Sequence, residues 1–395
     1  MLGNIRKRGA TWSYQFYIGM VDGKKRYKTK GGFQTKGEAS AALRTALTDY
    51  EEKGYIEPSK LTLNEFADEW LENYIKPVRK ISTYNRYVGL YNKYIRDTIG
   101  DIPLAEIKAY HIDKVLITNY NQVSTSTLQS VYGTINTIYN RALRLRVAKD
   151  NPCRYVDRPK REKVTYQVLD EKEIQQMLQA LDLSDKWDYQ FYIALNITIE
   201  LGLRRGELAG LEWKDIDFDN HTATIKSNLI YTNGHTYIQT PKTEESKRTL
   251  FISDQLLALL KKYKLHQAEN KLKYGEFYIK NIFDGKEYDF VMRWENGHYI
   301  HPLYYTNKIT KVIKKAGINK KIRFHDLRHT NATLLLKQGI DFKVIQNRLG
   351  HEDISTTINI YSHVDLQMQK EATNKLISAL NFEKNSDREC QENVK

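Results

Sequence analysis

The sequence predicts a multidomain chain: a small three-stranded β-sheet with a helix, then an all-α bundle, then a mainly α domain with a small β-hairpin. The length of 395 residues suggests two or three domains. Apolar residues alternate with polar ones near the start, whereas farther on they recur at helical spacing. A charged stretch has the composition of an extended linker. We therefore expect domains at residues 1–55, 61–155 and 167–382, followed by a flexible tail at 383–395.

The first segment has the pattern of a small sheet followed by a helix. Residues 12–18 place apolar side chains at every second position, which is typical of a half-buried strand. Asp22-Gly23 is a tight-hairpin signal. Thr35 and Glu38 have the spacing of a capping box, which predicts that a helix begins there.

The strand after this turn has a cation at every second position. Side chains two residues apart in a strand project from one face of the sheet. This pattern would place four cations together: Lys24, Arg26, Lys28 and Lys30. An edge strand blunted by solvated lysines is the alternative. Four cations in register favour contact with DNA.

The second segment has the apolar stripes of a helical core. Thr62 and Glu65 form another capping box, and Ser82 is expected to cap a further helix. The stripes consist of Leu63, Phe66, Ala67, Trp70, Leu71 and Tyr74, and of Leu128, Val131, Tyr132, Ile135, Ile138, Tyr139 and Ala142. Beside the second stripe, Arg141 and Arg144 belong to a cationic flank. This flank could meet a phosphate backbone or remain a solvated face.

The third segment alternates helices with one hairpin. Asp170 and Glu173 open a helix with a capping box. Gly202 has the residue type and position that end another helix. Asn233-Gly234 predicts the turn of the β-hairpin.

The composition favours a nucleic-acid partner and excludes several classes of protein. A net charge of +14 and a pI near 9.3 favour a polyanion, because neutralised phosphates release condensed counterions. The sequence has no run of about 18 apolar residues that would predict a membrane span, and its N-terminus lacks the apolar stretch of a signal peptide. Cys153 and Cys390 are too few for a disulfide framework or a zinc finger, which fits a reducing cytoplasm.

Four short motifs hold residue types suited to cutting a phosphodiester. They are Leu201-Gly202-Leu203-Arg204-Arg205-Gly206-Glu207-Leu208, His325-Asp326-Leu327-Arg328-His329, Leu349-Gly350-His351 and Thr356-Thr357-Ile358-Asn359-Ile360-Tyr361. The planar fork of arginine can hold two phosphate oxygens. A tyrosine phenol, with an ordinary pKa of about 10, needs a base or neighbouring cations before it attacks phosphorus. A neutral histidine can accept its proton.

In this order the motifs resemble the catalytic domain of tyrosine recombinases, the phage-integrase family. The first segment resembles the arm-type DNA-binding domain of phage integrases, and the second resembles the family's core-binding domain. The resemblance covers residues 1–382 and implies the tyrosine recombinase fold. It implies a catalytic set of Arg204, Lys242, His325, Arg328, His351 and Tyr361.

The resemblance implies how these residues share the work. Arg204, rather than Arg205, and Arg328 would hold the scissile phosphate. His325 would exchange a proton there, and His351 would hydrogen-bond and pack against the phosphate.

The same resemblance implies a covalent reaction. Tyr361 would attack the phosphate and form a 3′-phosphotyrosyl link, and Lys242 would protonate the released 5′ oxygen. A hydroxyl of the partner strand would reverse the step. The bond energy stays in the covalent intermediate, so no ATP, metal or other cofactor is implied.

By implication, the chain is a site-specific recombinase that integrates and excises a phage or mobile element. The implied partners are double-stranded DNA at core and arm sites and further copies of the chain in a homotetramer. DNA-bending and directionality proteins are candidate accessories, and no membrane is involved.

Three alternatives fit parts of the sequence. A type IB topoisomerase uses the same chemistry, but the arm-type segment argues against it. A DNA-binding regulator without catalysis would not need the whole set of catalytic residue types. His325 and His329 have the spacing of a zinc-binding pair, but Asp326 replaces the expected glutamate and Arg328 would place a cation beside the metal. We expect His329 to support the site through a hydrogen bond.

Overall fold

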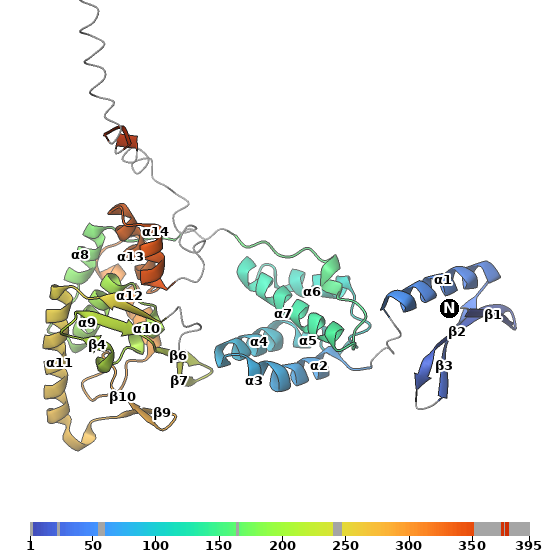
Figure 1. The fold of residues 1–395 in the computed structure, drawn as a ribbon, viewed down its shortest axis with the longest axis horizontal. Helices are drawn as coiled ribbons and strands as arrows, with labels where there is room; N and C mark the ends of the chain where they lie inside the picture. The colour runs from blue at the N-terminus through green and yellow to red at the C-terminus, as the bar shows by residue number, and fades with distance from the viewer. Residues whose placement is uncertain are drawn as a thin grey trace, which may run out of the picture. The chain divides into compact units, whose positions relative to one another are not determined.

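A computed structural model describes residues 3–21, 24–53, 60–162, 166–239 and 247–350, together with 373–374 and 376–378. The chain divides into two compact units, Met1–Lys163 and Val164–Lys395 (Figure 1). The first unit holds two separate hydrophobic cores, one at the sheet and one in the helical bundle. These separate cores support the predicted division of this unit into two domains, which stays a prediction. The predicted turn at Asp22-Gly23 lies outside the described residues.

The N-terminal part is a three-stranded antiparallel sheet covered by a helix. Its elements are β1 (Gly3–Arg8), β2 (Thr11–Val21), β3 (Lys24–Phe33) and α1 (Lys36–Lys53), with the strands in the order β1-β2-β3. Tyr14 and Phe16 of β2 pack against Leu43 of α1. The predicted capping box is present, because the backbone N–H of Glu38 donates to Thr35 Oγ1 over 3.1 Å. A sheet followed by a helix is therefore confirmed.

Three cations of β3, Arg26, Lys28 and Lys30, lie on the side of the sheet that α1 covers. Directly paired residues of antiparallel strands share a face, and Lys28 pairs with Phe16 while Lys30 pairs with Tyr14. Arg26 alternates onto the same face of β3. Three of the four predicted cations, Arg26, Lys28 and Lys30, therefore share the face on which the sheet packs against its helix, whereas the side chain of Lys24 lies outside the described residues.

The opposite face of this sheet carries cations of its own. Tyr17 and Tyr27 meet there across β2 and β3, with ring centroids 5.6 Å apart. Arg6 and Arg8 of β1 and Lys25 of β3 alternate onto this face and are exposed. This face of the module therefore combines aromatic rings with positive charge.

The rest of the first unit is a helical bundle. Its elements are α2 (Leu63–Trp70), the π-helical turn η1 (Leu71–Ile75), α3 (Lys76–Val78), α4 (Ile81–Tyr94), α5 (Arg96–Ile99), α6 (Ala109–Asn119), α7 (Thr125–Arg144) and the 3-10 turn η2 (Pro152–Tyr155). Thr62 caps α2 in a capping box with Glu65, as predicted. Both predicted apolar stripes are buried, with Tyr74 and Tyr132 partly exposed at their edges.

One predicted helix cap is wrong. Because α4 begins at Ile81, Ser82 is its second residue, and the residue before the helix, Lys80, makes no side-chain cap hydrogen bond. A cap must sit in non-helical backbone just before the first turn. Ser124 meets this condition at α7, where its Oγ accepts from the backbone N–H of Thr127 over 3.3 Å.

The second unit is mainly helical with small sheets. Its helices are α8 (Glu171–Gln179), α9 (Lys186–Leu201), α10 (Arg205–Ala209), α11 (Asp254–Tyr274), α12 (Pro302–Lys315), α13 (Asp326–Lys337) and α14 (Phe342–Leu349), with the 3-10 turns η3 (Trp213–Asp215) and η5 (Gly275–Phe277). Its strands are β4 (Ile216–Asp217), β5 (Thr222–Ile225), β6 (Asn228–Thr232), β7 (His235–Gln239), β8 (Arg248–Phe251), β9 (Asn281–Phe283) and β10 (Lys286–Tyr288). They form the sheets β4-β5-β8, β6-β7 and β9-β10. The hairpin β6-β7 was predicted, whereas the other strands are too short to show a clear alternation.

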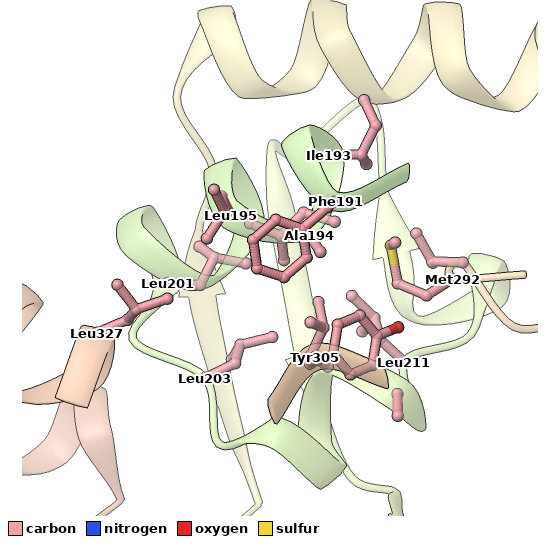
Figure 2. Close-up of a cluster of buried hydrophobic side chains, with 14 of the residues drawn as sticks. Phe191, Ile193, Ala194, Leu195, Leu201, Leu203, Leu211, Met292, Tyr305 and Leu327 are labelled. Carbon is pink, nitrogen blue, oxygen red and sulfur yellow. The ribbon is translucent and has the colours of Figure 1, made fainter. Parts of the chain in front are cut away.

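The central helix of this unit is α9 (Figure 2). Its Phe191, Ala194 and Leu195 have no exposed surface and pack among residues from later in the chain, including Leu211 and Met292. A helix that is apolar on most sides belongs in a core. Its burial gives the residues that follow α9 a rigid starting point.

Local signals set several boundaries of the second unit. Asp170 and Glu173 form the predicted capping box of α8. Asn233 and Gly234 have φ angles of 48° and 79°, as the predicted two-residue hairpin turn requires. Asp341 caps α14, because its side chain accepts a hydrogen bond from the backbone N–H of Lys343.

Candidate active site

Arg204 emerges where α9 ends. Gly202 adopts a φ of 64°, a left-handed conformation that favours glycine, and it terminates the helix. Leu203 is buried, which leaves Arg204 to turn back toward α10. Its Nη1 lies 2.7 Å from Glu207 Oε1, and its Nη2 donates to Gly350 O over 3.0 Å. Arg204 is thus held between α10 and the end of α14.

The neighbouring Arg205 takes another direction. Its Nη1 donates to Thr306 Oγ1 of α12 over 2.6 Å. This geometry supports the preference for Arg204 over Arg205 as the phosphate-binding residue.

Arg328 reaches the same place from the first turn of α13. Its side chain is 1% exposed. Nη1 donates to Gly202 O over 2.8 Å and Nη2 donates to Leu349 O. The buried Nε of Arg328 has no hydrogen-bond partner among the described residues. Burial, followed by the charge of Arg204, lowers the pKa of this guanidinium.

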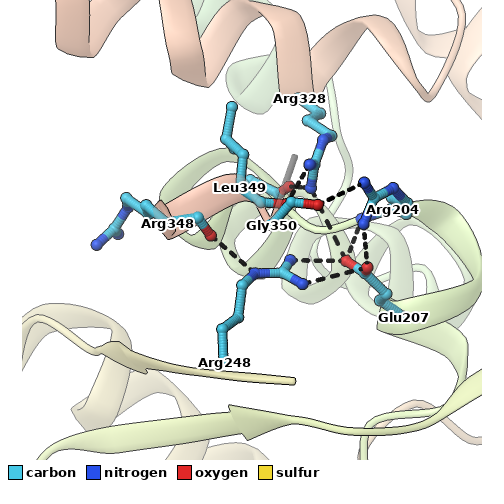
Figure 3. A network of polar contacts seen from close by, with 8 residues as sticks. Arg204, Glu207, Arg248, Arg328, Arg348, Leu349 and Gly350 are labelled. Carbon is cyan, nitrogen blue, oxygen red and sulfur yellow. Dashed lines mark hydrogen bonds and ion pairs between the residues drawn. The ribbon is translucent and has the colours of Figure 1, made fainter. Parts of the chain in front are cut away.

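A buried carboxylate, Glu207, lies among the arginines (Figure 3). Arg248 of β8 donates to both of its oxygens, over 3.2 Å and 2.8 Å. Arg328 Nη1 lies 3.9 Å from Glu207 Oε2. Burial opposes the ionisation of Glu207, but Arg248, and then Arg204 and Arg328, lower the pKa of the carboxyl to about 2. Glu207 is therefore an anion across the working pH range.

Two members of this cluster were not predicted as site residues. They are Glu207 and Arg248. Glu207 stands inside the motif around Arg204, which could have marked it. No local pattern marks Arg248, because the carboxylate it contacts lies 41 residues earlier.

His325 and His329 stand on consecutive turns, with ring centroids 5.0 Å apart. His325 is exposed to solvent, yet the surrounding protein reduces its hydration and, with the charges of Arg328 and Arg204, lowers its pKa. It is a neutral imidazole at neutral pH and can accept a proton. Burial and His325 lower the pKa of His329 to about 4.

The hydrogen bond expected from His329 is not found at its Nδ1. That atom is buried without a partner among the described residues. The ring packs instead against Tyr166, with centroids 4.4 Å apart. His329 supports the site by packing.

The structure places only part of the predicted catalytic set. It brings Arg204, Arg328 and His325 together at the ends of α9, α13 and α14. Lys242 lies in residues 240–246, and His351 and Tyr361 follow Gly350, all outside the described residues. Their positions stay predictions.

The cations proposed for DNA binding occupy two places in the first unit. Arg26, Lys28 and Lys30 lie on β3, where Lys24 begins the strand and has a side chain outside the described residues. In α7, Arg144 is exposed, whereas Arg141 is half-buried with its guanidinium 4.0 Å from the ring centroid of Tyr74. Arg141 therefore also contributes packing.

Within the described ranges, no group of three or more His, Cys, Asp or Glu residues is placed to hold a metal ion. None of the described helices is long and apolar enough to cross a membrane.

Family profiles match the chain in three places. The profile described as "Phage integrase family" covers residues 167–368, "Arm DNA-binding domain" covers residues 4–50, and "Phage integrase, N-terminal SAM-like domain" covers residues 62–118. The first of these alone covers more than half of the chain.

Curated relatives match over most of the chain's length. A tyrosine recombinase XerC-like protein of Caldanaerobacter subterraneus subsp. tengcongensis is 29% identical over 86% of this chain and 88% of its own length. The integrase of Staphylococcus phage L54a is 27% identical over 82% of this chain and 95% of its own. The ICEBs1 integrase of Bacillus subtilis is 28% identical over 64% and 66%, respectively.

Solved structures share the fold at lower identity. The Tn1549 transposon integrase in complex with a circular intermediate DNA superposes with a TM-score of 0.67 and 21% identity, over 80% of this chain and 99% of that chain. A lambda integrase tetramer bound to a Holliday junction gives a TM-score of 0.56 and 19% identity, over 90% and 94%.

Proposed function

This chain belongs to the phage integrase family of tyrosine recombinases, enzymes that cleave DNA and transfer its strands, and we propose that Tyr361 is its nucleophile. The chain is accordingly a site-specific DNA recombinase. The observation that carries the residue assignment is the convergence of Arg204 and Arg328 at the end of α14, directly before the segment that contains Tyr361.

The proposed reaction begins at one phosphodiester. Arg204 and Arg328 hold its non-bridging oxygens and stabilise the negative charge that grows on them. The Tyr361 oxygen forms a bond to phosphorus while the bond from phosphorus to the 5′ oxygen breaks, which leaves a 3′-phosphotyrosyl link. A 5′-hydroxyl of the partner strand then attacks this link and releases Tyr361, so no ATP is consumed.

Two proton transfers accompany this exchange. His325, neutral at working pH, accepts the proton of the Tyr361 phenol. Lys242 gives a proton to the leaving 5′ oxygen, and His351 packs against the phosphate and donates a hydrogen bond to it. Arg204, Arg328 and Lys242 supply the electrostatic stabilisation that a metal ion provides in metal-dependent enzymes.

The chain's relatives support a proposal for the setting of the reaction. A phage integrase is among them, and a transposon integrase is among the similar solved structures. We propose that this chain integrates and excises such an element in the cytoplasm of a bacterial host. It would act as a homotetramer on two duplexes, as the lambda integrase assembly on a Holliday junction suggests. DNA-bending and directionality proteins are proposed accessories.

The N-terminal module would bind the arm sites. The match of residues 4–50 to an arm DNA-binding domain supports this assignment. Two sets of cations can serve it: Arg26, Lys28 and Lys30 on the helix side of the sheet, together with Lys24 at the start of β3, and Arg6, Arg8 and Lys25 on the other side. In the helical bundle, Arg141 and Arg144 would contact the core site.

Trapping of a covalent adduct tests this proposal. A pool of nicked duplexes of randomised sequence is incubated with the chain, and adducts resistant to denaturing gel electrophoresis are recovered and sequenced. The recovered sequence then serves as a suicide substrate. Tyr361→Phe keeps the ring and should bind this DNA normally while forming no adduct. Excess chelator should leave the wild-type rate unchanged.

Two outcomes would count against the assignment. Undiminished adduct formation by Tyr361→Phe would move the nucleophile to another residue. Loss of activity in chelator, restored by zinc, would favour a metal site at His325 and His329.

A further inference from the structure

Arg248 joins three segments that meet at the site. It starts β8, and only 6% of its side chain is exposed. Its two terminal nitrogens contact Glu207 on α10, while its Nε donates to Arg348 O at the end of α14 over 2.7 Å. A Cβ added to Gly350 would lie 3.3 Å from the Arg248 side chain, so this arginine runs closely along the end of α14.

The last carbonyls of α14 are each bound by a different arginine (Figure 3). Arg348 O accepts from Arg248, Leu349 O from Arg328 and Gly350 O from Arg204. The carbonyl end of a helix carries partial negative charge, and cations stabilise it there. Three arginines thus hold the backbone at the end of α14, after which the sequence continues to His351 and Tyr361.

Arg204, Arg328 and Arg248 differ in their exposure and in the groups that they contact. Arg204 has 37% of its side chain exposed, so a phosphate can reach it. Arg328 contacts Gly202 and Leu349, and its buried Nε has no partner among the residues that the structure describes. Arg248 instead directs all three of its nitrogens at protein oxygens. Its described contacts hold other residues.

Loss of Arg248 would change the balance of charge around Glu207. A buried carboxylate without its bidentate partner attracts the cations that remain. Arg204 already contacts Glu207 at 2.7 Å, and Arg328 lies 3.9 Å away. Both would be drawn toward the carboxylate and away from a phosphate. A displacement of about 1 Å at such a site can cost about 100-fold in rate.

We propose that Arg248 is a positioning residue for DNA cleavage, which holds Glu207 and the end of α14 so that Arg204 and Arg328 stay directed at one phosphate. This inference rests on the proposed function of the site. In this role Arg248 acts through Glu207 and the end of α14.

The experiment compares Arg248→Gln and Arg248→Lys with Arg293→Gln in the full chain. Arg293 is a matched control, because it is also a mostly buried arginine of the second unit. Its side chain is 13% exposed and binds Asp289 and Gln267 away from the cluster. For each variant we would measure the thermal unfolding midpoint, the affinity for the suicide duplex, and the single-turnover cleavage rate at saturating protein.

Arg248→Gln should cleave at least about 100-fold more slowly once bound, with affinity within about threefold of wild type. Arg248→Lys keeps the charge but not the planar fork, so it should recover stability more than rate. Arg293→Gln should lower the unfolding midpoint while cleavage of bound DNA stays within about threefold of wild type.

A second substitution separates positioning from a general loss of stability. In Arg248→Gln/Glu207→Gln the carboxylate that attracts the arginines is gone. The double variant should therefore cleave bound DNA at least about tenfold faster than Arg248→Gln alone. If Arg248→Gln does not fold, Arg248→Lys and the double variant carry the comparison.

The outcomes test the positioning role of Arg248 and the proposed function of the chain separately. Normal cleavage by bound Arg248→Gln, or an equal loss in Arg293→Gln, would overturn the positioning role and leave the proposed function intact. Absence of a covalent adduct from the wild-type chain would overturn the proposed function itself.

Discussion

Arg204 and Arg328 both lie near Glu207, but they differ in their exposure to solvent. Arg204 is partly exposed, whereas Arg328 is enclosed and bonded to backbone carbonyls. A guanidinium satisfies several such contacts at once because its donors lie in one plane. An ammonium of similar length offers a single point charge instead. At the scale of residues, the site therefore depends on the shape of arginine as well as its charge.

Arg204→Lys and Arg328→Lys should each lower the cleavage rate by several powers of ten, since lysine cannot make the two-point contact to phosphate. Single-turnover cleavage of a suicide substrate at saturating protein measures this loss. Near-normal cleavage by either variant would reassign that arginine to a structural ion pair.

His325 makes the rate depend on pH in a predictable direction. Its pKa lies below the ordinary value of 6.5, because of reduced hydration and the charges of Arg328 and Arg204. If the neutral ring accepts the phenol proton, the rate should fall as the pH drops, and half of it should be lost only below pH 6.5. A pH–rate profile of the bound complex measures this limb. Half-loss at pH 6.5 or above would contradict the assignment, and His325→Gln should lack the limb altogether.

At the scale of elements, the site forms where α9, α13 and α14 converge on Gly202. Asn331 of α13 donates to Ile199 O and Glu200 O in the last turn of α9. A Cβ on Gly202 would lie 2.5 Å from Leu349 of α14 and 2.9 Å from Asn331. This glycine is therefore needed for close approach as well as for its left-handed backbone.

Gly202→Ala should destabilise the chain by at least about 2 kcal/mol, because backbone strain of about 1–2 kcal/mol adds to the clash. Cleavage should fall as well, since Gly202 O anchors Arg328. Gly234→Ala is the matched control: its φ of 79° is also left-handed, but nothing lies within 4 Å of the added Cβ. Urea unfolding measures both. Equal losses in the two variants would exclude a special packing role for Gly202.

The N-terminal sheet offers a comparison between its two faces. Neutralising Arg26, Lys28 and Lys30, or Arg6, Arg8 and Lys25, with glutamine should show which face meets the arm site. Each lost phosphate contact should reduce the slope of log affinity against log salt concentration by about one unit. Salt titrations of arm-site binding measure it. An unchanged slope in both variants would remove the phosphate-contact role from both sets.

At the scale of the whole molecule, the candidate chemistry belongs to one unit. The contacts among Arg204, Glu207, Arg248 and Arg328 all lie in Val164–Lys395. The N-terminal sheet has its own core, separate from that of the helical bundle. Cleavage at a core site should therefore not require the sheet.

A chain that begins at Leu61 should cleave the short suicide duplex at close to the wild-type rate, while it loses affinity for a distant arm site. Adduct formation and arm-site binding are measured in parallel, with circular dichroism as the control for folding. Loss of core-site cleavage by a folded, shortened chain would make the N-terminal module part of the catalytic architecture.

The sequence by itself determined the local features of this protein. Thr62 with Glu65 and Asp170 with Glu173 cap helices through contacts three residues apart, and Asn233-Gly234 makes a turn from its own backbone preferences. These features depend on neighbours in the chain, so they can be recognised without the fold. The predicted cap at Ser82 was wrong because a cap depends on where the helix begins, and the residue type of Ser82 alone does not set that point.

Only the tertiary structure decided which distant residues share the site. Arg248 contacts a carboxylate 41 residues earlier and a carbonyl 100 residues later, and Arg204 reaches Gly350 across 146 residues. Alternation predicted that Arg26, Lys28 and Lys30 share a face, but only the pairing of Lys28 with Phe16 shows that α1 covers this face. Packing of α9, α13 and α14 brings distant segments into contact, and no local sequence pattern in one segment identifies its partners in another. Their partners could therefore be found only after the chain was folded.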